Sequence, residues 1–182
     1  MRVITGTARG RRLKTPADNR VRPTTDKVKE AVFSILQFSL YGRVFLDLFA
    51  GTGQMGIEAL SRGAERSLFV DSSKASLALV EENVQLTGFS DRAAIIRADY
   101  RSYLAGLRQT VDVAFLDPPY QKDILPQALE LLIPHMAPDG CIVCEHAPED
   151  ALPEAVGNFY LQKKRTYGRI IISVYTPQEE IA

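Results

Sequence analysis

The 182-residue sequence has little from which a disulfide or a metal site could be built. Its only cysteines are Cys141 and Cys144, and its only histidines are His135 and His146. A zinc site would need a second pair of ligands, and a redox CxxC motif would stand where a strand runs into a helix. Both cysteines instead lie within an apolar segment that is typical of a buried strand. We therefore expect them to be structural, and we expect no metal.

Long apolar runs are also missing from the sequence. No segment approaches the ~20 residues that a helix needs to span a bilayer, and the first residues lack the apolar centre of a secretory signal. There is no internal repeat and no low-complexity segment. With 46% hydrophobic and 24% charged residues, the composition is that of an ordinary globular protein. We expect a soluble, cytoplasmic, monomeric protein with no membrane partner.

The formal net charge of zero hides an uneven distribution. Residues 1–30 contain nine Lys or Arg and three Asp or Glu, which gives +6 and leaves −6 for the rest. A basic arm on an acidic body favours an anionic partner such as a nucleic acid. The alternative is a solvated tail that has no partner.

From about residue 42 onward, short apolar segments alternate with amphipathic ones. This alternation predicts an α/β fold, with helices on both faces of a mostly parallel, doubly wound sheet. The last two strands are so close in sequence that they should form an antiparallel hairpin. The seven expected strands cover residues 44–48, 67–70, 94–97, 111–116, 141–144, 160–164 and 170–175.

Residues 1–41 differ from this pattern, and we expect a basic N-terminal extension packed on a domain of residues 42–182. Gly6 and Gly10 separate two short segments, which suggests a small basic hairpin. Pro23-Thr24-Thr25 then starts a helix, whose apolar stripe consists of Val28, Ala31, Val32, Ile35 and Leu36.

A glycine-rich segment, Gly51-x-Gly53-x-x-Gly56, follows the first strand of the expected sheet. Glycines allow a sharp turn and a close approach of the backbone to a ligand, next to the positive end of a helix. Two ligand classes use such a loop. A nicotinamide or flavin dinucleotide places its pyrophosphate there, whereas S-adenosylmethionine lays its carboxylate and sugar against it.

Acidic residues near the ends of three successive strands favour S-adenosylmethionine. Asp47 stands where a dinucleotide fold usually has an apolar residue, and its carboxylate can pair with the ammonium group of the ligand. Asp71 can accept hydrogen bonds from both ribose hydroxyls, as an acid in a dinucleotide enzyme also would. Asp99 can accept from the adenine amine, or it can merely cap the next helix. Together the three acids would line one crevice of the sheet.

The fourth strand ends in Asp117-Pro118-Pro119-Tyr120, the most specific motif in the sequence. Two prolines remove two amide donors and stiffen the turn. The Asp117 carboxylate and the Pro118 carbonyl could then accept both N–H bonds of an exocyclic amine and turn its lone pair toward a methyl donor. Tyr120 could stack on a flipped base. The alternative is an ordinary Pro-Pro turn.

With these motifs together, nearly the whole chain resembles the RsmD family of bacterial 16S ribosomal RNA guanine-N2 methyltransferases. The Asp-Pro-Pro-Tyr motif is shared with amino methyltransferases of DNA and other RNAs, whereas the N-terminal motifs are narrower. The chain departs from the family pattern at Gln54-Met55 and at Arg169. The matching segments are residues 2–6, 9–13, 22–26, 29–30, 46–53, 56–64 and 117–120.

The resemblance implies a Rossmann-like class I methyltransferase with an N-terminal RNA-binding extension. It also implies methyl transfer from S-adenosylmethionine to the N2 amine of a guanine in 16S ribosomal RNA, on assembling small-subunit particles. The expected catalytic residues are Asp117, Pro118, Pro119 and Tyr120. The expected cofactor-binding residues are Asp47, Phe49, Gly51, Thr52, Gly53, Asp71, Ser72, Asp99 and Tyr100. The expected RNA-binding residues are Arg9, Arg11, Arg12, Arg22, Thr24 and Thr25.

Two other functional classes remain open at the level of the sequence. An NAD-dependent oxidoreductase would explain the glycine loop and Asp71, but it gives the proline corner no task. A non-catalytic RNA-binding module would explain the basic arm alone. Among methyltransferases, DNA enzymes usually need a larger region that reads the DNA sequence, and protein glutamine enzymes generally have Asn where this chain has Asp117.

Overall fold

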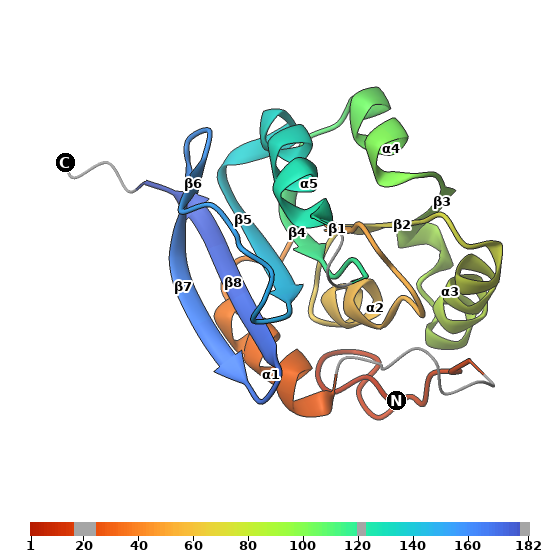
Figure 1. Ribbon diagram of the computed structural model, residues 1–182. Coiled ribbons are helices and arrows are strands. Elements are labelled where there is room, and N and C mark those ends of the chain that lie inside the picture. The colour runs from red at the N-terminus through yellow and green to blue at the C-terminus, as the bar shows by residue number, and fades with distance from the viewer. Residues whose placement is uncertain (17–24, 120–122, 179–182) are drawn as a thin grey trace.

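The computed structural model describes residues 1–16, 25–119 and 123–178, and Figure 1 shows one central sheet between two layers of helices. In the described residues the sheet has eight strands in the order β3-β2-β1-β4-β5-β8-β7-β6. The strands are β1 Val44–Asp47, β2 Arg66–Asp71, β3 Ala93–Arg97, β4 Val111–Leu116, β5 Met136–His146, β6 Ala155–Val156, β7 Phe159–Tyr167 and β8 Ile170–Pro177.

The strand directions confirm the predicted class of fold and add one strand to it. The first five strands are parallel to one another, and β8, β7 and β6 follow as antiparallel neighbours. The expected β7–β8 hairpin is present, with Gly168 at a positive φ of 63° in its turn. The prediction of seven strands missed β6, because its two residues are too few to show a periodic pattern.

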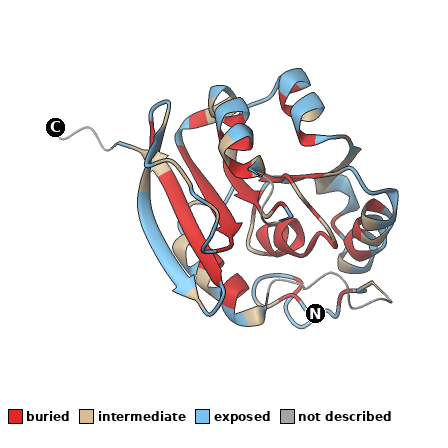
Figure 2. Ribbon diagram, in the orientation of Figure 1, coloured by how far each residue is buried: buried red, intermediate tan, exposed pale blue. Residues whose placement is uncertain are grey.

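Helices cover both faces of the sheet. One core cluster joins apolar side chains of α1 (Asp26–Ile35), α2 (Gln54–Ser61) and α3 (Lys74–Thr87) to Phe45 and Phe115 of the sheet. A second cluster joins α4 (Tyr100–Gly106) and α5 (Ile124–Leu132) to Leu46 and Leu116, the residues that directly follow Phe45 and Phe115 in the strands. Successive strand residues thus face opposite layers, and most of the central strands are buried in Figure 2. The described part of the chain also has two short 3-10 helices, at Ser90–Arg92 and Ile133–His135.

Both cysteines lie in β5, as the apolar pattern predicts. Cys141 and Cys144 are buried and free, and they belong to the two different core clusters. Burial raises the pKa of the Cys141 thiol to about 12 and raises that of Cys144 as well. Both therefore stay protonated and pack as small apolar side chains. None of the helices in the described residues is long and apolar enough to cross a membrane.

The first 16 residues form a hairpin-like loop that packs against α2. Among the described residues its strand pairing consists of one antiparallel bridge, between Arg2 and Arg12, so the pairing is shorter than the sequence suggested. Val3 is buried in the first core cluster. At Gly6, a Cβ atom would lie 1.8 Å from the carbonyl oxygen of Ser61 on α2, so only glycine allows this close approach.

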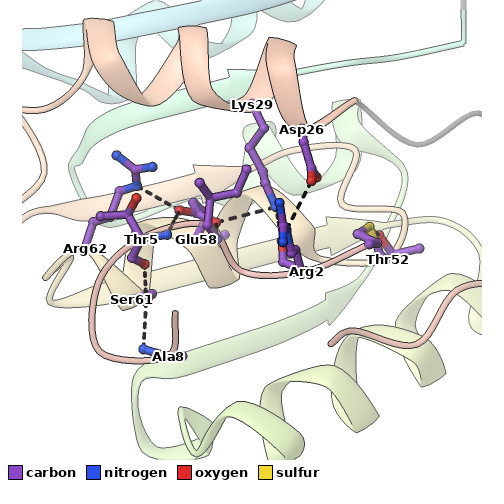
Figure 3. Close-up of polar contacts among 12 residues, drawn as sticks. Arg2, Thr5, Ala8, Asp26, Lys29, Thr52, Glu58, Ser61 and Arg62 are labelled. Carbon is purple, nitrogen blue, oxygen red and sulfur yellow. Dashed lines mark hydrogen bonds and ion pairs between the residues drawn. The ribbon is translucent and has the colours of Figure 1, made fainter. Parts of the chain in front are cut away.

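A buried network of charged groups joins the loop, α1 and α2 (Figure 3). The Glu58 carboxylate on α2 is fully buried and accepts hydrogen bonds from the backbone N–H groups of Ile4 at 2.8 Å and Thr5 at 2.9 Å. Lys29 of α1 is also fully buried. Its ammonium group donates to the Arg2 carbonyl and lies 3.5 Å from Glu58. Arg62 completes the network through a 2.9 Å bond to Glu58.

Truncation of Glu58 should destabilise the protein strongly. Glu58→Ala would leave the Lys29 ammonium without its carboxylate and two backbone N–H groups without an acceptor, so we expect a loss of about 3–5 kcal/mol in the free energy of unfolding. Urea denaturation measures this loss. The matched control is Glu65→Ala, an exposed glutamate just beyond the same helix, which should change stability by less than about 0.5 kcal/mol. Equal effects of the two variants would contradict the role assigned to Glu58.

Candidate active site

A cleft of about 1320 Å³ opens at the carboxyl ends of the parallel strands. Its walls come from the residues that follow β1, β2, β3, β4 and β5, from the β7–β8 turn, and from the end of the N-terminal loop at Thr15 and Pro16. The strand order reverses between β1 and β4, and open α/β sheets bind their ligands at such a reversal.

The glycine loop lies between β1 and α2 at one side of the cleft. Gly51 and Gly53 have positive φ values of 54° and 76°, which other residues rarely adopt. Gly51 and Thr52 line the cleft. Gly53, the N-cap residue of α2, is not among the lining residues, and a Cβ atom there would lie 3.2 Å from the side chain of Val80. Gly56 has a packing task, because a Cβ atom there would lie 2.3 Å from the ring of Phe69. The loop therefore brings backbone groups to the cleft next to a helix N-terminus.

Asp71 holds this loop in place from the end of β2. One carboxylate oxygen accepts a 2.9 Å hydrogen bond from the N–H of Gly51, and the other accepts a 2.8 Å bond from the N–H of Ser73. Asp71 and its neighbour Ser72 both line the cleft. Each carboxylate oxygen has a second lone pair, so Asp71 can still accept from a ligand.

Asp47 is buried beneath the loop, at the end of β1. It is 2% exposed, and its carboxylate accepts a 3.0 Å hydrogen bond from the N–H of Gly56. Burial, with a smaller effect of the charge on Asp71, raises the pKa of Asp47 to about 8. The side chain borders the cleft. A cationic group placed beside it would favour its ionised form.

An aromatic wall and a capped helix lie across the cleft. The rings of Phe49 and Tyr100 are 5.6 Å apart at an interplanar angle of 50°, and both residues line the cleft. Asp99 lines it too and is the N-cap of α4, where its carboxylate accepts a 3.0 Å bond from the N–H of Arg101. Asp99 therefore does cap α4, one of the two roles that the sequence left open for it. It leaves the second carboxylate oxygen as a further acceptor at the cleft.

The proline corner follows β4 and borders the cleft with Asp117, Pro118 and Pro119. Asp117 is half-buried. Burial raises the pKa of Asp117 well above its usual range, and the nearby charges of Glu145 and Asp47 add to this effect. Tyr120, predicted to stack on the base, lies outside the described residues.

The cleft also contains residues that the sequence analysis did not single out as site residues. Glu145 lies near the end of β5, and residues 147–149 follow that strand. Arg169 comes from the β7–β8 turn, and Ile170 is the first residue of β8. For Glu145 a signal existed, because it is an acid near the end of an apolar strand, as Asp47 and Asp71 are. The other residues reach the cleft only through the register of distant strands. Both departures from the family pattern, Gln54-Met55 and Arg169, also fall in the cleft wall.

The predicted RNA-binding residues are placed only in part. Arg9, Arg11 and Arg12 are exposed on the N-terminal loop. Thr25 is the N-cap of α1, where its hydroxyl accepts a 3.4 Å hydrogen bond from the N–H of Val28. The predicted RNA-binding residues that lie outside the described part of the chain are Arg22 and Thr24.

Asn83 of α3 connects the N-terminal loop to the glycine loop. It is fully buried, and its side-chain oxygen accepts a 2.7 Å bond from the N–H of Lys14. Its side-chain nitrogen donates to the carbonyl oxygens of Lys14 at 3.1 Å and Thr52 at 3.0 Å. The basic loop and one wall of the cleft are therefore held by the same side chain.

The sheet order, the glycine loop after β1 and the acids at the strand ends define a Rossmann-like class I methyltransferase fold. Comparison with known proteins supports this assignment of the fold. The solved structure of the Escherichia coli protein yhhF superposes with a TM-score of 0.88 at 30% identity, covering 99% of each chain.

Residues 1–176 match the protein family described as conserved hypothetical protein 95. YlbH of Bacillus subtilis (strain 168) is 42% identical over 180 residues, which cover 96% of this chain and 98% of YlbH. The ribosomal RNA small subunit methyltransferase D of Haemophilus influenzae is 34% identical over 182 residues, which cover 96% of this chain and 93% of that protein. The chain belongs to this family, the RsmD family of ribosomal RNA methyltransferases. The oxidoreductase and the non-catalytic alternatives are thereby set aside.

The raised pKa of Asp47 predicts pH-dependent cofactor binding. Below pH 8 the carboxyl group is mostly protonated in the free protein, and a ligand ammonium group would bind better to the ionised form. The affinity for S-adenosylhomocysteine should therefore rise between pH 6 and pH 8, by at most tenfold per pH unit. Calorimetric titration across this range measures the slope.

In the same titration, Asp47→Asn should bind more weakly at pH 8 and show a flatter pH dependence, because an amide does not ionise. Asp91→Asn, which changes an exposed acid outside the cleft, is the matched control and should keep the wild-type profile. A wild-type pH slope in Asp47→Asn would assign the titration to another group.

Proposed function

We propose that the protein transfers a methyl group from S-adenosylmethionine to the N2 amine of a guanine in 16S ribosomal RNA, on assembling small-subunit particles. The observation that carries this proposal is the proline corner. Asp117 and Pro118 stand in the same cleft as the glycine loop, in a chain of the RsmD family. The corner suits an amine because it offers two acceptors on a stiff turn.

The residues of the cleft fit S-adenosylmethionine. The Gly51–Thr52 backbone would face its carboxylate, Asp71 its ribose hydroxyls, and the Phe49–Tyr100 wall with Asp99 its adenine. The side-chain oxygen of Gln54 supports this fit, because it is buried in the cleft wall and has no hydrogen-bond partner among the described residues. With Asp47 it supplies acceptors for an ammonium group.

When bound, S-adenosylmethionine supplies a methyl group activated by its positively charged sulfur. The chain's own contribution is to hold and orient the amine. Asp117 and the Pro118 carbonyl would accept its two N–H bonds, so that the nitrogen lone pair points at the methyl carbon. The amine nitrogen would take the methyl group from the sulfur, which would leave S-adenosylhomocysteine, and the amine would then give up one proton to a carboxylate or to water. Catalysis thus rests on positioning and on electrostatics.

The direct test uses small-subunit particles from cells that lack the enzyme. Incubation with labelled S-adenosylmethionine should place label in 16S RNA, and mass spectrometry of RNA digests should locate it as N2-methylguanine at one nucleotide. Label in another base, or in protein alone, would contradict the proposal.

Asp117→Ala should abolish transfer while leaving cofactor affinity nearly unchanged. The variant loses the proposed amine acceptor, and a loss that affects kcat more than substrate binding is expected for a group that acts in the transition state. Turnover on particles and calorimetric titration with S-adenosylhomocysteine measure the two effects. The proposal requires less than about a tenth of wild-type turnover. Asp91→Ala is the control and should retain full activity.

The exposed arginines of the N-terminal loop should contribute to RNA affinity. Changing Arg9, Arg11 and Arg12 to Ala should weaken binding to particles and flatten its salt dependence, by about 0.7 in the slope of log K against log salt for each lost phosphate contact. Arg108→Ala is the control, because Arg108 is exposed just beyond α4 on the opposite layer of helices. An unchanged slope in the triple variant would place the RNA contact elsewhere.

A further inference from the structure

The β7–β8 hairpin is a second basic segment of the chain. Residues 155–178 contain four Lys or Arg and no Asp or Glu, which adds +4 to the +6 of residues 1–30 and leaves −10 for the rest. The four cations are Lys163, Lys164 and Arg165 of β7 and Arg169 of the turn, and all four are exposed. An acidic body therefore carries positive charge in two separate segments.

Lys163 and Arg165 lie on the same face of the sheet. In the antiparallel pairing of β7 with β8, Lys163 is opposite Val174 and Arg165 is opposite Ile172, and both partners belong to the first core cluster. Tyr167, two residues further along β7, packs against the same cluster. Because alternate residues of a strand share a face, these side chains lie on the side of the sheet where α1 and the N-terminal loop pack.

Lys164 lies on the opposite face. It pairs with Ser173 of β8, which in turn pairs with Cys144 of β5, a member of the second core cluster. Two adjacent lysines of one strand therefore point to opposite sides of the sheet.

The face that carries Lys163 and Arg165 is open to a large partner. Val174 and Ile172 are buried, whereas the two cations beside them on β7 are exposed, so the helix layer ends between β8 and β7. On the outer side, β6 pairs with only two residues of β7. Figure 2 shows most of β7 exposed beside the buried β8.

The cations of the hairpin are also free of local counter-charges. None of the four forms an ion pair within the part of the chain that the structure describes. By contrast, Lys14 of the N-terminal loop is paired with Glu82 at 2.6 Å. Binding of phosphate groups to the hairpin would therefore break no ion pair of the protein, and it would release counterions from the nucleic acid.

Both basic segments reach the same cleft. Arg169 of the hairpin lines it, as do Thr15 and Pro16 at the end of the N-terminal loop. In the sheet order, the proline corner after β4 lies between the glycine loop after β1 and the hairpin beyond β5. Figure 1 shows the N-terminal loop and the β7–β8 turn at the same, lower edge of the molecule. The two segments thus flank the proposed methylation site.

We propose that the β7–β8 hairpin is a second RNA-binding surface, on which Lys163 and Arg165 bind phosphates of the RNA next to the target guanine and Arg169 binds at the mouth of the cleft. This inference rests on the proposed function. It adds a contact on the far side of the proline corner from the glycine loop, so that the RNA is held on both sides of the target nucleotide.

The first test uses the wild-type protein and compares the two adjacent lysines. Acetylation of lysines with and without small-subunit particles, read by mass spectrometry, measures the protection of each side chain. Lys163 should be protected at least about fivefold, because a bound phosphate blocks its amine, whereas Lys164 should react nearly as in the free protein. Protein-free 16S RNA should protect Lys163 as well.

Two results of this experiment would overturn the inference. Equal reactivity of Lys163 with and without particles would show that the face is not covered. Protection by particles but not by protein-free RNA would assign the face to a ribosomal protein.

The second test removes the charges. Lys163→Gln together with Arg165→Gln should weaken binding to particles and flatten its salt dependence by about 1.4 in the slope of log K against log salt, at about 0.7 for each lost phosphate contact. The loss should appear in the KM for particles and not in the affinity for S-adenosylhomocysteine. Lys163→Arg together with Arg165→Lys keeps both charges and should retain the wild-type slope.

The matched control is Lys164→Gln together with Arg108→Gln, which removes the same charge from the opposite face. It should keep the wild-type slope. Equal flattening by the two pairs would indicate a general effect of net charge and would contradict a binding face on the hairpin.

The outcomes separate this inference from the proposed function. If the wild-type enzyme methylates guanine in the particles while Lys163 stays unprotected, the inference fails and the proposed function stands. If the wild-type enzyme places no methyl group on guanine, the proposed function fails whatever the acetylation shows, and the inference fails with it.

Discussion

The reversal of strand order between β1 and β4 is the constraint on which the site depends. The helices that follow β1 and β4 lie on opposite faces of the sheet, which leaves a crevice at the carboxyl ends of these two strands. Asp47 and Asp117 come from these neighbouring strand ends, and Asp71 and Glu145 come from the next strand on either side. The acids of the cleft are thus brought together by topology, although they are spread over about a hundred residues of sequence.

The N-terminal segment is attached to one wall of the same cleft by buried contacts. Glu58 and Lys29 hold the first residues of the chain against α2, the helix that begins at the glycine loop. Asn83 holds Lys14 and the carbonyl of Thr52 together. Basic residues proposed to contact RNA are therefore carried on a segment that is fixed to one wall of the cleft. Such an attachment would place an RNA bound to these residues close to the glycine loop.

The sequence predicted the parts of the site that depend on local signals. The glycine loop follows a strand, Asp47 and Asp71 end apolar runs, and Asp117 stands in a motif that can be recognised directly. Arg169 was missed because it enters the cleft through the pairing of β5, β8 and β7, which depends on contacts between distant segments. Glu145 was missed although it carries the same local signal as Asp47 and Asp71, an acid near the end of an apolar strand. The strand β6 was missed for another reason, since two residues carry no measurable period.

The short length of β6 has a consequence for how the protein behaves at high concentration. It pairs only with Phe159 and Tyr160, so the rest of β7 is an open edge of the sheet in the described residues. Unpaired edges invite strands of other molecules and so promote aggregation. Along this edge the chain carries Lys163, Lys164 and Arg165, all exposed. Pairing of two such edges would bring like charges together. This run of positive charge therefore disfavours edge-to-edge association.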